Sequence, residues 1–112
     1  MPAYNRIDRI SEEVKKELSI IIRELKDPRI TTVISVVNVN VTKDLKFAKA
    51  YISVFGDENA QKGVLDALNS AAGFIRREIG HRVKLRATPE FSFVLDNSIE
   101  YGAHINEVLK NL

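Results

Sequence analysis

Five basic side chains stand close together in the second half of this 112-residue sequence, between residues 76 and 86. Glu78 is the one acidic residue among them, although the whole chain has a formal net charge of only +2 at pH 7. Positive charge concentrated in one stretch attracts a phosphate backbone even when a protein is nearly neutral, but it does not separate RNA from DNA. We therefore predict a phosphate-binding surface formed by Arg76, Arg77, Arg82, Lys84 and Arg86.

An ordinary charged surface with local ion pairs is the alternative interpretation of such a run. Arg76 and Arg77 are expected on the exposed flanks of a helix, because the apolar positions on either side of them share its buried stripe. Lys84 and Arg86 alternate with apolar residues, so they are expected on one face of a following strand. Because the charge falls on one side of two neighbouring elements, we favour phosphate binding.

A second, weaker basic cluster near a predicted hairpin comprises Lys43, Lys46 and Lys49. We include these lysines in the predicted phosphate-binding surface, although protection of a sheet edge explains them equally well. Phe47, Tyr51 and Phe55 are spaced along the same predicted strand. Aromatic rings in such positions can stack on nucleic-acid bases, but we predict that these three pack under a loop or a neighbouring helix.

Motifs of enzyme chemistry are missing from the sequence. It contains no cysteine, which excludes disulfides and thiolate metal sites, and its two histidines, His81 and His104, are far apart. No GxxxxGK[ST], GxGxxG or GxSxG pattern occurs. The longest uncharged run, residues 30–42, is too short to cross a bilayer. We predict a cytoplasmic, monomeric protein that is not an enzyme and needs no metal or cofactor.

The elements that carry these clusters follow from the spacing of apolar residues. Spacings of three and four predict a first helix over residues 5–26, capped by Asn5 and ended by Pro28. Residues 32–41 and 46–55 are rich in Val and Ile and predict two strands joined in an antiparallel hairpin.

The sequence also predicts which residues of the first strand are buried. Val37, Val39 and Val41 alternate with polar residues and are expected on its buried face, whereas residues 33–36 are expected to be covered on both sides.

The second half of the chain repeats the change from helix to strand. Helical spacing runs from about residue 60 to residue 80, with Asn59 as its predicted cap. Glycine costs about 1 kcal/mol relative to alanine inside a helix, so we predict a kink at Ala71-Ala72-Gly73. The alternation after Gly80 predicts a strand over residues 83–87, interrupted by Pro89 and resumed over residues 91–95.

A last helix over residues 98–110, capped by Asn97, completes the prediction. The whole chain, residues 1–112, is then one α+β domain, with a three-stranded sheet and its helices packed on one face.

Four motifs resemble a known family. They are Arg6-Ile-Asp-Arg-Ile-Ser-Glu-Glu-Val14, the Lys-Asp-Pro-Arg-Ile run ending at Ile30, Ala71-Ala-Gly73 with the following Phe-Ile-Arg-Arg-Glu, and Leu85-Arg-Ala-Thr-Pro-Glu-Phe-Ser-Phe93 with Asp96-Asn-Ser98. In this order, together with the order of elements, they resemble a type II KH domain and, within that class, the ribosome-binding factor A family.

The resemblance implies a function. It implies a non-enzymatic ribosome-assembly factor that binds the free small (30S) ribosomal subunit, contacts 16S rRNA and supports late rRNA maturation, notably in the cold, with small-subunit ribosomal proteins as further contacts. A KH domain usually grips single strands with a GxxG loop, but Ala71-Ala72-Gly73 stands in that place. Recognition of folded RNA by shape and phosphates is therefore expected. A KH-like module for other RNA and a protein-interaction module are the alternatives.

Overall fold

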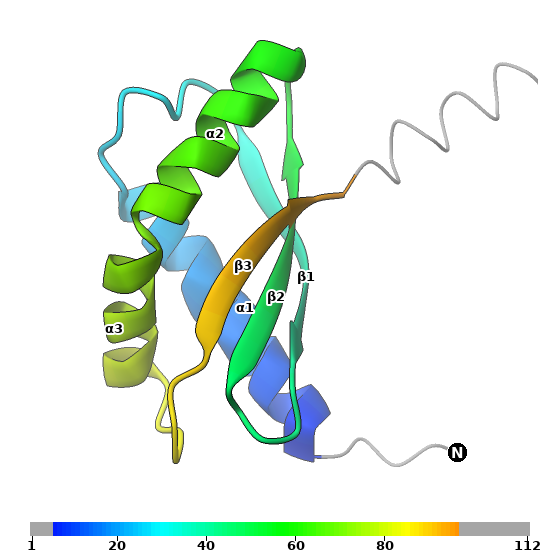
Figure 1. Ribbon diagram of the computed structural model, residues 1–112, viewed down its shortest axis with the longest axis vertical. Helices are drawn as coiled ribbons and strands as arrows, with labels where there is room; N and C mark the ends of the chain where they lie inside the picture. The colour runs from blue at the N-terminus through cyan, green and yellow to red at the C-terminus, as the bar shows by residue number, and fades with distance from the viewer. Residues whose placement is uncertain (1–5, 97–112) are drawn as a thin grey trace, which may run out of the picture.

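The computed structural model describes residues 6–96, and these residues form three helices and three strands. The strand β2 lies in the middle of the sheet and pairs antiparallel with β1 and parallel with β3. The predicted hairpin is thus confirmed. Figure 1 shows the arrangement of α1 (Arg6–Glu24), β1 (Ile34–Val41), β2 (Phe47–Val54), α2 (Glu58–Ser70), α3 (Ala72–Arg82) and β3 (Glu90–Leu95).

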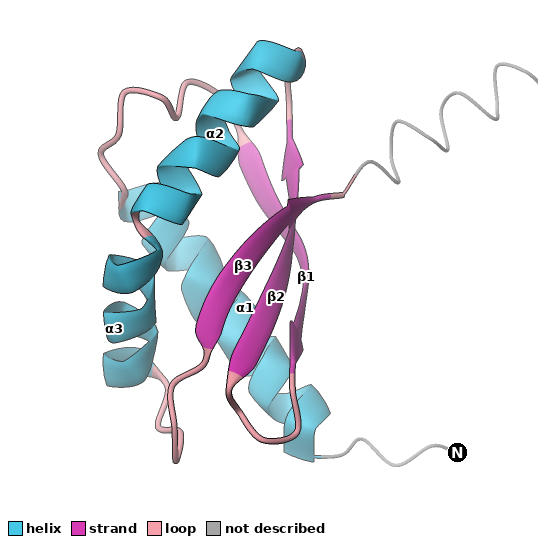
Figure 2. Cartoon of the chain, viewed as in Figure 1, coloured by secondary structure: helices cyan, strands magenta, loops and turns pink. Residues whose placement is uncertain are grey.

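One face of the sheet is buried under the helices, and the other face is open (Figure 2). Along β2, Ala50 and Ile52 are fully buried, whereas Lys49 between Ala48 and Ala50 is exposed. This alternation confirms the predicted α+β class, a KH-like three-stranded sheet with helices packed on one face. The helices add to this core the fully buried side chains of Val14, Leu18, Ile21, Val64, Leu68, Ile75 and Ile79.

The first helix ends at Glu24, two residues before its predicted end, and a tight turn follows at Pro28. Arg29 closes this turn by donating hydrogen bonds from its backbone nitrogen and Nε to Asp27 Oδ1, at 2.9 and 3.0 Å, and from Nη2 to Oδ2 at 2.7 Å. These hydrogen bonds lower the pKa of Asp27 to about 2. The Lys-Asp-Pro-Arg-Ile run is therefore a structural clamp. The predicted cap Asn5 lies outside the described residues.

The prediction for the first strand is wrong at two points. The pairing of β1 with β2 shifts register between Val36 and Asn38, so a bulge buries Val36 and leaves Val37 half-buried. An extra residue in one strand reverses the alternation on either side of it, which a period-two pattern cannot show. Val33, expected to be covered on both sides, lies before β1 with 74% of its surface exposed.

The predicted kink is confirmed: Ala71, whose φ and ψ are −91° and 4°, is the single residue that separates α2 from α3. Gly73 lies within the first turn of α3, where a Cβ would approach Arg77 Nη1 only to 4.0 Å. The break therefore uses a backbone conformation at Ala71 that any residue can adopt, and not one that favours glycine. The predicted cap Asn59 is wrong, because Asp57 accepts the hydrogen bond from Ala60 N at 2.9 Å.

The predicted strand over residues 83–87 is wrong. These residues form an irregular connection, and pairing with β2 begins only at Glu90, whose backbone nitrogen donates to Lys46 O at 2.9 Å. The resumed strand is confirmed as β3. The predicted helix over residues 98–110, with Asn97 as its cap, lies outside the described residues. Within residues 6–96, no helix has the length and apolar character needed to cross a membrane.

Candidate nucleic-acid interface

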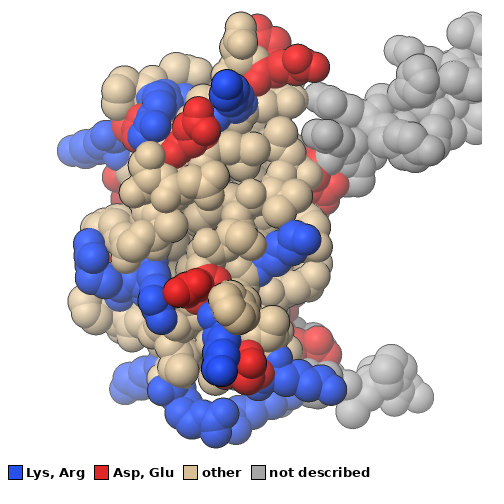
Figure 3. Space-filling model, viewed as in Figure 1, with Lys and Arg blue, Asp and Glu red and all other residues tan. Residues whose placement is uncertain are grey.

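Lysine and arginine side chains gather at one end of the molecule, along the lower edge of Figure 3. Three segments meet there: the first turn of α1, the turn between β1 and β2, and the connection from α3 to β3. Leu45, in the turn between the strands, lines two hollows at this end and so joins them. We call this surface the basic end and define it by Arg6, Arg9, Lys46, Arg76, Lys84 and Arg86.

The first hollow has a volume of about 280 Å³ and is surrounded by basic groups. Its apolar lining comes from Ile10, Leu45 and Leu85, and Glu13 is its one carboxylate. Among the described residues, no carboxylate forms an ion pair with any of its four cations. The hollow is therefore able to receive an anion from outside the chain. The four cations are Arg6, Arg9, Lys84 and Arg86.

Arg6 and Arg9 were not predicted as part of the surface, because the first 29 residues contain nearly equal numbers of acidic and basic groups. A signal was nevertheless present in the sequence. Cations are unfavourable beside the positive end of a helix dipole, and residues three apart lie on the same helical face. Two arginines at that spacing near the start of a helix indicate a surface prepared for an external anion.

The second hollow, of about 230 Å³, lies on the other side of Leu45. Arg76 is held there by its own chain, since Nε and Nη2 donate hydrogen bonds to the carbonyl oxygen of Thr88 at 3.2 and 3.1 Å. Its Nη1 lies 4.0 Å from a carboxylate oxygen of Glu90, a distance at which an exposed pair contributes little. The guanidinium is thus oriented without being neutralised.

The turn that carries Leu45 is held in one conformation by a small network of hydrogen bonds. Thr42 Oγ1 donates to Asp44 Oδ1 at 2.7 Å, and that oxygen also accepts from the backbone nitrogen of Lys46 at 3.0 Å. These bonds lower the pKa of Asp44, with the Thr42 hydroxyl as the main cause. Leu45 has a φ of 62°, which is unfavourable for a branched side chain, but it is almost completely buried. The side chain anchors the turn between the two hollows.

Arg77 faces a third hollow, of about 540 Å³, between α3 and the connection that follows it. Gly80 brings these two segments close, because a Cβ at this position would lie 2.9 Å from Thr88 Oγ1. Arg76 lines this hollow as well as the second one. Arg77 therefore lies next to Arg76 and extends the basic end along α3.

Arg82 does not belong to this surface, although it was predicted to. Its Nη2 lies 3.0 Å from carboxylate oxygens of both Glu24 and Glu78, and its Nη1 lies 4.0 Å from Glu17. Hydrogen bonds to Glu24 and then to Glu78 raise the pKa of Arg82 further above its usual range. This guanidinium joins α3 to α1, and we leave it out of the interface.

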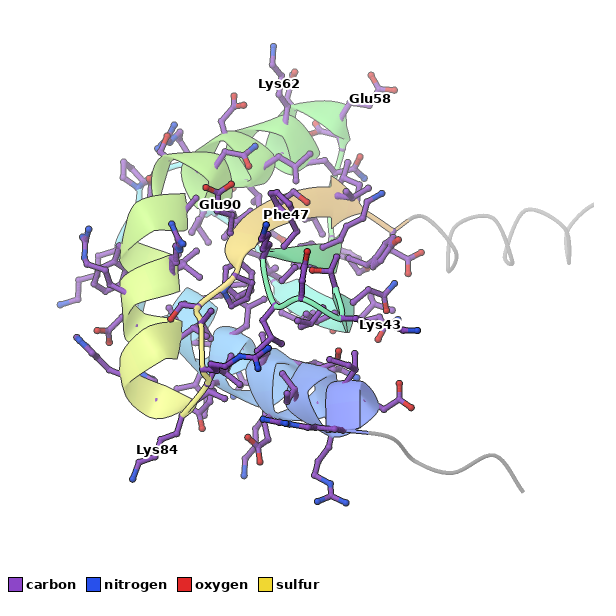
Figure 4. The ribbon with its side chains drawn as sticks, turned by 60° about the horizontal axis from the view of Figure 1, so that its bottom comes forward. Lys43, Phe47, Glu58, Lys62, Lys84 and Glu90 are labelled. Atoms are coloured by element: carbon purple, nitrogen blue, oxygen red, sulfur yellow. The ribbon has the colours of Figure 1, made fainter. Side chains whose placement is uncertain are left out.

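Lys43 and Lys49 lie apart from the first hollow. Figure 4 shows Lys43 and Lys84 toward opposite margins of the basic end. Lys49 stands on the open face of the sheet, with Nζ 5.8 Å from the centre of the Tyr51 ring. The prediction that the aromatic side chains of this strand are packed is wrong for Phe47 and Phe55, of which 55% and 79% are exposed.

The kink residues Ala71 and Gly73 lie at the start of α3, whereas Lys84 follows its end. The helix therefore separates the kink from the first hollow. Residues 6–96 contain no group of three or more His, Cys, Asp or Glu side chains suited to hold a metal ion.

A sequence model of the family described as Ribosome-binding factor A matches residues 6–109. The chain belongs to the ribosome-binding factor A family. A family member from Clostridium novyi (strain NT) is 58% identical over 111 residues, which cover 98% of this chain and 92% of the relative. This agreement over nearly the whole length confirms the resemblance that the four motifs indicated.

Solved structures of the family agree with the fold. The crystal structure of ribosome-binding factor A from Thermus thermophilus superposes with a TM-score of 0.72 and 26% identity, over 81% of this chain and 97% of that one. A homology model of the Thermus thermophilus factor, fitted into a cryo-EM map of a 30S–RbfA complex, superposes with a TM-score of 0.65 and 28% identity, over 78% and 91% of the two chains.

Proposed function

We propose that this protein is a ribosome-assembly factor that binds the free small (30S) ribosomal subunit through its basic end. It contacts 16S rRNA there and supports late maturation of that RNA, including in the cold. Family membership and the 30S complex of the Thermus thermophilus relative support this role. The observation that carries the proposal is the group of four cations around the first hollow, which have no carboxylate partner among residues 6–96.

The ligand of the basic end is folded RNA rather than a clamped single strand. The chain has no GxxG loop, and the cations come from three segments that are far apart in the sequence. Such an arrangement matches phosphates that are brought together by RNA folding. The proposal treats residues 1–112 as one KH-like RNA-binding domain that acts as a cytoplasmic monomer, by binding alone and without a cofactor.

Charge reversal at the first hollow tests the proposal. We expect the double variant Arg9→Glu with Lys84→Glu to keep the wild-type melting temperature, because both side chains are exposed, and to lose co-sedimentation with free small subunits at low salt.

The control must change the net charge equally at a distant site. Lys26→Glu with Lys62→Glu does so, because Lys26 follows the far end of α1 and Lys62 points away from the basic end (Figure 4). Unchanged co-sedimentation of the Arg9/Lys84 variant, or equal losses in both variants, contradicts binding through this surface.

A further inference from the structure

Phe47 is a large aromatic side chain that the fold leaves half uncovered, with 55% of its surface exposed. Single apolar residues on a surface are common, so exposure alone assigns no role. The position of Phe47 is distinctive. It is the first residue of β2, lies on the open face of the sheet, and lines the second hollow of the basic end. Glu90 is its register partner on β3, and Figure 4 shows the two side by side.

The second hollow combines an aromatic ring, other apolar side chains, and both positively and negatively charged groups. Leu45 and Ala87 add apolar surface to that of Phe47, while Lys46 and Arg76 supply positive charge. Its volume of about 230 Å³ is below that of most drug-sized sites, which begin at about 300 Å³. A space of this size and composition fits one flat, partly polar group attached to an anionic chain.

Glu90 distinguishes this hollow from a simple phosphate site. Its carboxylate is exposed, and within residues 6–96 its ion-pair partner is Arg76, at 4.0 Å. An ionised carboxylate is negatively charged, so it repels a phosphate. It accepts hydrogen bonds and donates none, so it attracts a group with adjacent N–H donors. Guanine carries such donors on its N1 and its 2-amino group, and its ring face stacks on an aromatic side chain.

We propose that the second hollow binds one unstacked guanine base of RNA, stacked on Phe47 and hydrogen-bonded through N1 and the 2-amino group to Glu90. Lys46 and Arg76 then lie beside the phosphates that flank the base. This inference rests on the proposed function, since it requires RNA at the basic end, and it adds a base-specific contact to a surface otherwise suited to phosphates.

The test uses the full chain and two RNA hairpins that differ by a single bulged guanosine. Phe47→Leu removes the aromatic face but keeps an apolar side chain at an exposed position, so folding is unaffected. We expect this variant to bind the bulged hairpin about tenfold more weakly than wild type, as loss of one stacked base implies, and to bind the unbulged hairpin equally well. Fluorescence anisotropy at fixed salt measures both affinities.

Phe55→Leu is the matched control, because Phe55 follows the opposite end of β2 and is 79% exposed. We expect it to bind both hairpins like wild type. A second variant, Glu90→Ala, is tested with a third hairpin, in which an adenosine replaces the bulged guanosine. We expect wild type to prefer the guanosine, and Glu90→Ala to lose this preference while Phe47 stays in place.

Three results overturn the inference: equal affinity of wild type for the two hairpins, equal losses in Phe47→Leu and Phe55→Leu, or a Phe47→Leu variant that loses small-subunit binding but keeps the bulged hairpin. The last result assigns the ring to a protein contact. Each of them leaves the proposed function standing if the Arg9/Lys84 variant still loses subunit binding, so the two failures are distinguishable.

Discussion

Two basic residues of the same short stretch have opposite environments. Arg82 donates to Glu24 and Glu78 at 3.0 Å, whereas Lys84 has no carboxylate partner among the described residues and lines the first hollow. The difference arises from α1, since Glu24 stands 58 positions before Arg82 in the chain. Charge density along the sequence is therefore an incomplete guide to a binding surface, because the fold neutralises some cations and leaves others available.

The Asp27–Arg29 clamp predicts a local dependence of stability on pH. The pKa of Asp27 is lowered to about 2 from an ordinary value of 3.8, so the folded state favours the carboxylate. The stabilisation is then fully present above pH 3.8 and is lost as the pH falls through about 2. We expect Asp27→Asn to unfold at lower urea concentration than wild type at pH 6, and the difference to shrink between pH 4 and pH 2. A difference that stays constant over this range contradicts the clamp.

The residues of the candidate surface were partly predictable from the sequence. Arg76, Arg77, Lys84 and Arg86 were found from local charge, and all four line hollows at or beside the basic end. Arg6 and Arg9 were missed because acidic neighbours balance them along the chain, although the helix directs the two arginines to the hollow. The exposure of Phe47 was missed because an alternating pattern does not show which face of a sheet stays open.

At the scale of elements, the turn between β1 and β2 is the part that fixes the geometry of the basic end. The Thr42–Asp44–Lys46 hydrogen bonds and the buried side chain of Leu45 hold it in one conformation. Because Leu45 contributes to both hollows, this turn sets the distance between the first hollow, where we propose phosphate contacts, and the second hollow, where we propose a base site. A rigid spacing favours RNA that is already folded over RNA that must be arranged on binding.

The break between α2 and α3 yields a prediction for Gly73, one of the three residues at which the kink was predicted. Gly73 lies inside α3 and a Cβ there makes only ordinary contact, at 4.0 Å, with Arg77. We therefore expect Gly73→Ala to keep the break and to raise the free energy of unfolding by about 0.5–1 kcal/mol, through helix propensity. Urea unfolding followed by circular dichroism measures the change. A clear loss of stability shows instead that the break needs glycine.

Helices and strands were predicted well where their own residues carry the pattern, and poorly where pairing with another strand determines the structure. The amphipathic stripe of α1 and the hairpin of β1 and β2 were found from their own residues. Residues 83–87 alternate like a strand, but they do not form one. The hydrogen bonds between β2 and β3 begin only at Glu90, whose backbone nitrogen donates to Lys46 O. The bulge between Val36 and Asn38 could not be predicted for the same reason, because it is a shift in the pairing of β1 with β2.

At the scale of the whole molecule, the charged side chains of the basic end are separate from the core that holds the fold together, although Leu45 belongs both to the core and to the lining of the two hollows. The core lies between the helices and one face of the sheet, and none of the buried residues is polar or charged within the described part of the chain. The six cations of the basic end are all exposed; five come from the first turn of α1, the turn between β1 and β2 and the connection after α3, and the sixth, Arg76, comes from α3 itself. Substitutions of these cations are therefore expected to leave the core intact, so that the proposed RNA affinity can be tested separately from folding.

This separation predicts how affinity depends on salt. Each phosphate contact releases counterions, so the binding constant decreases as salt is added. In a plot of the logarithm of the binding constant against the logarithm of salt concentration, the slope becomes less steep by about one for each contact removed. We expect Arg9→Gln with Arg86→Gln to reduce the slope for small-subunit binding by about two. Lys26→Gln with Arg82→Gln removes the same charge away from the surface, and we expect it to leave the slope unchanged even if the loss of the Glu24 and Glu78 contacts lowers stability. Equal slopes in the two variants indicate that net charge, and not the basic end, determines binding.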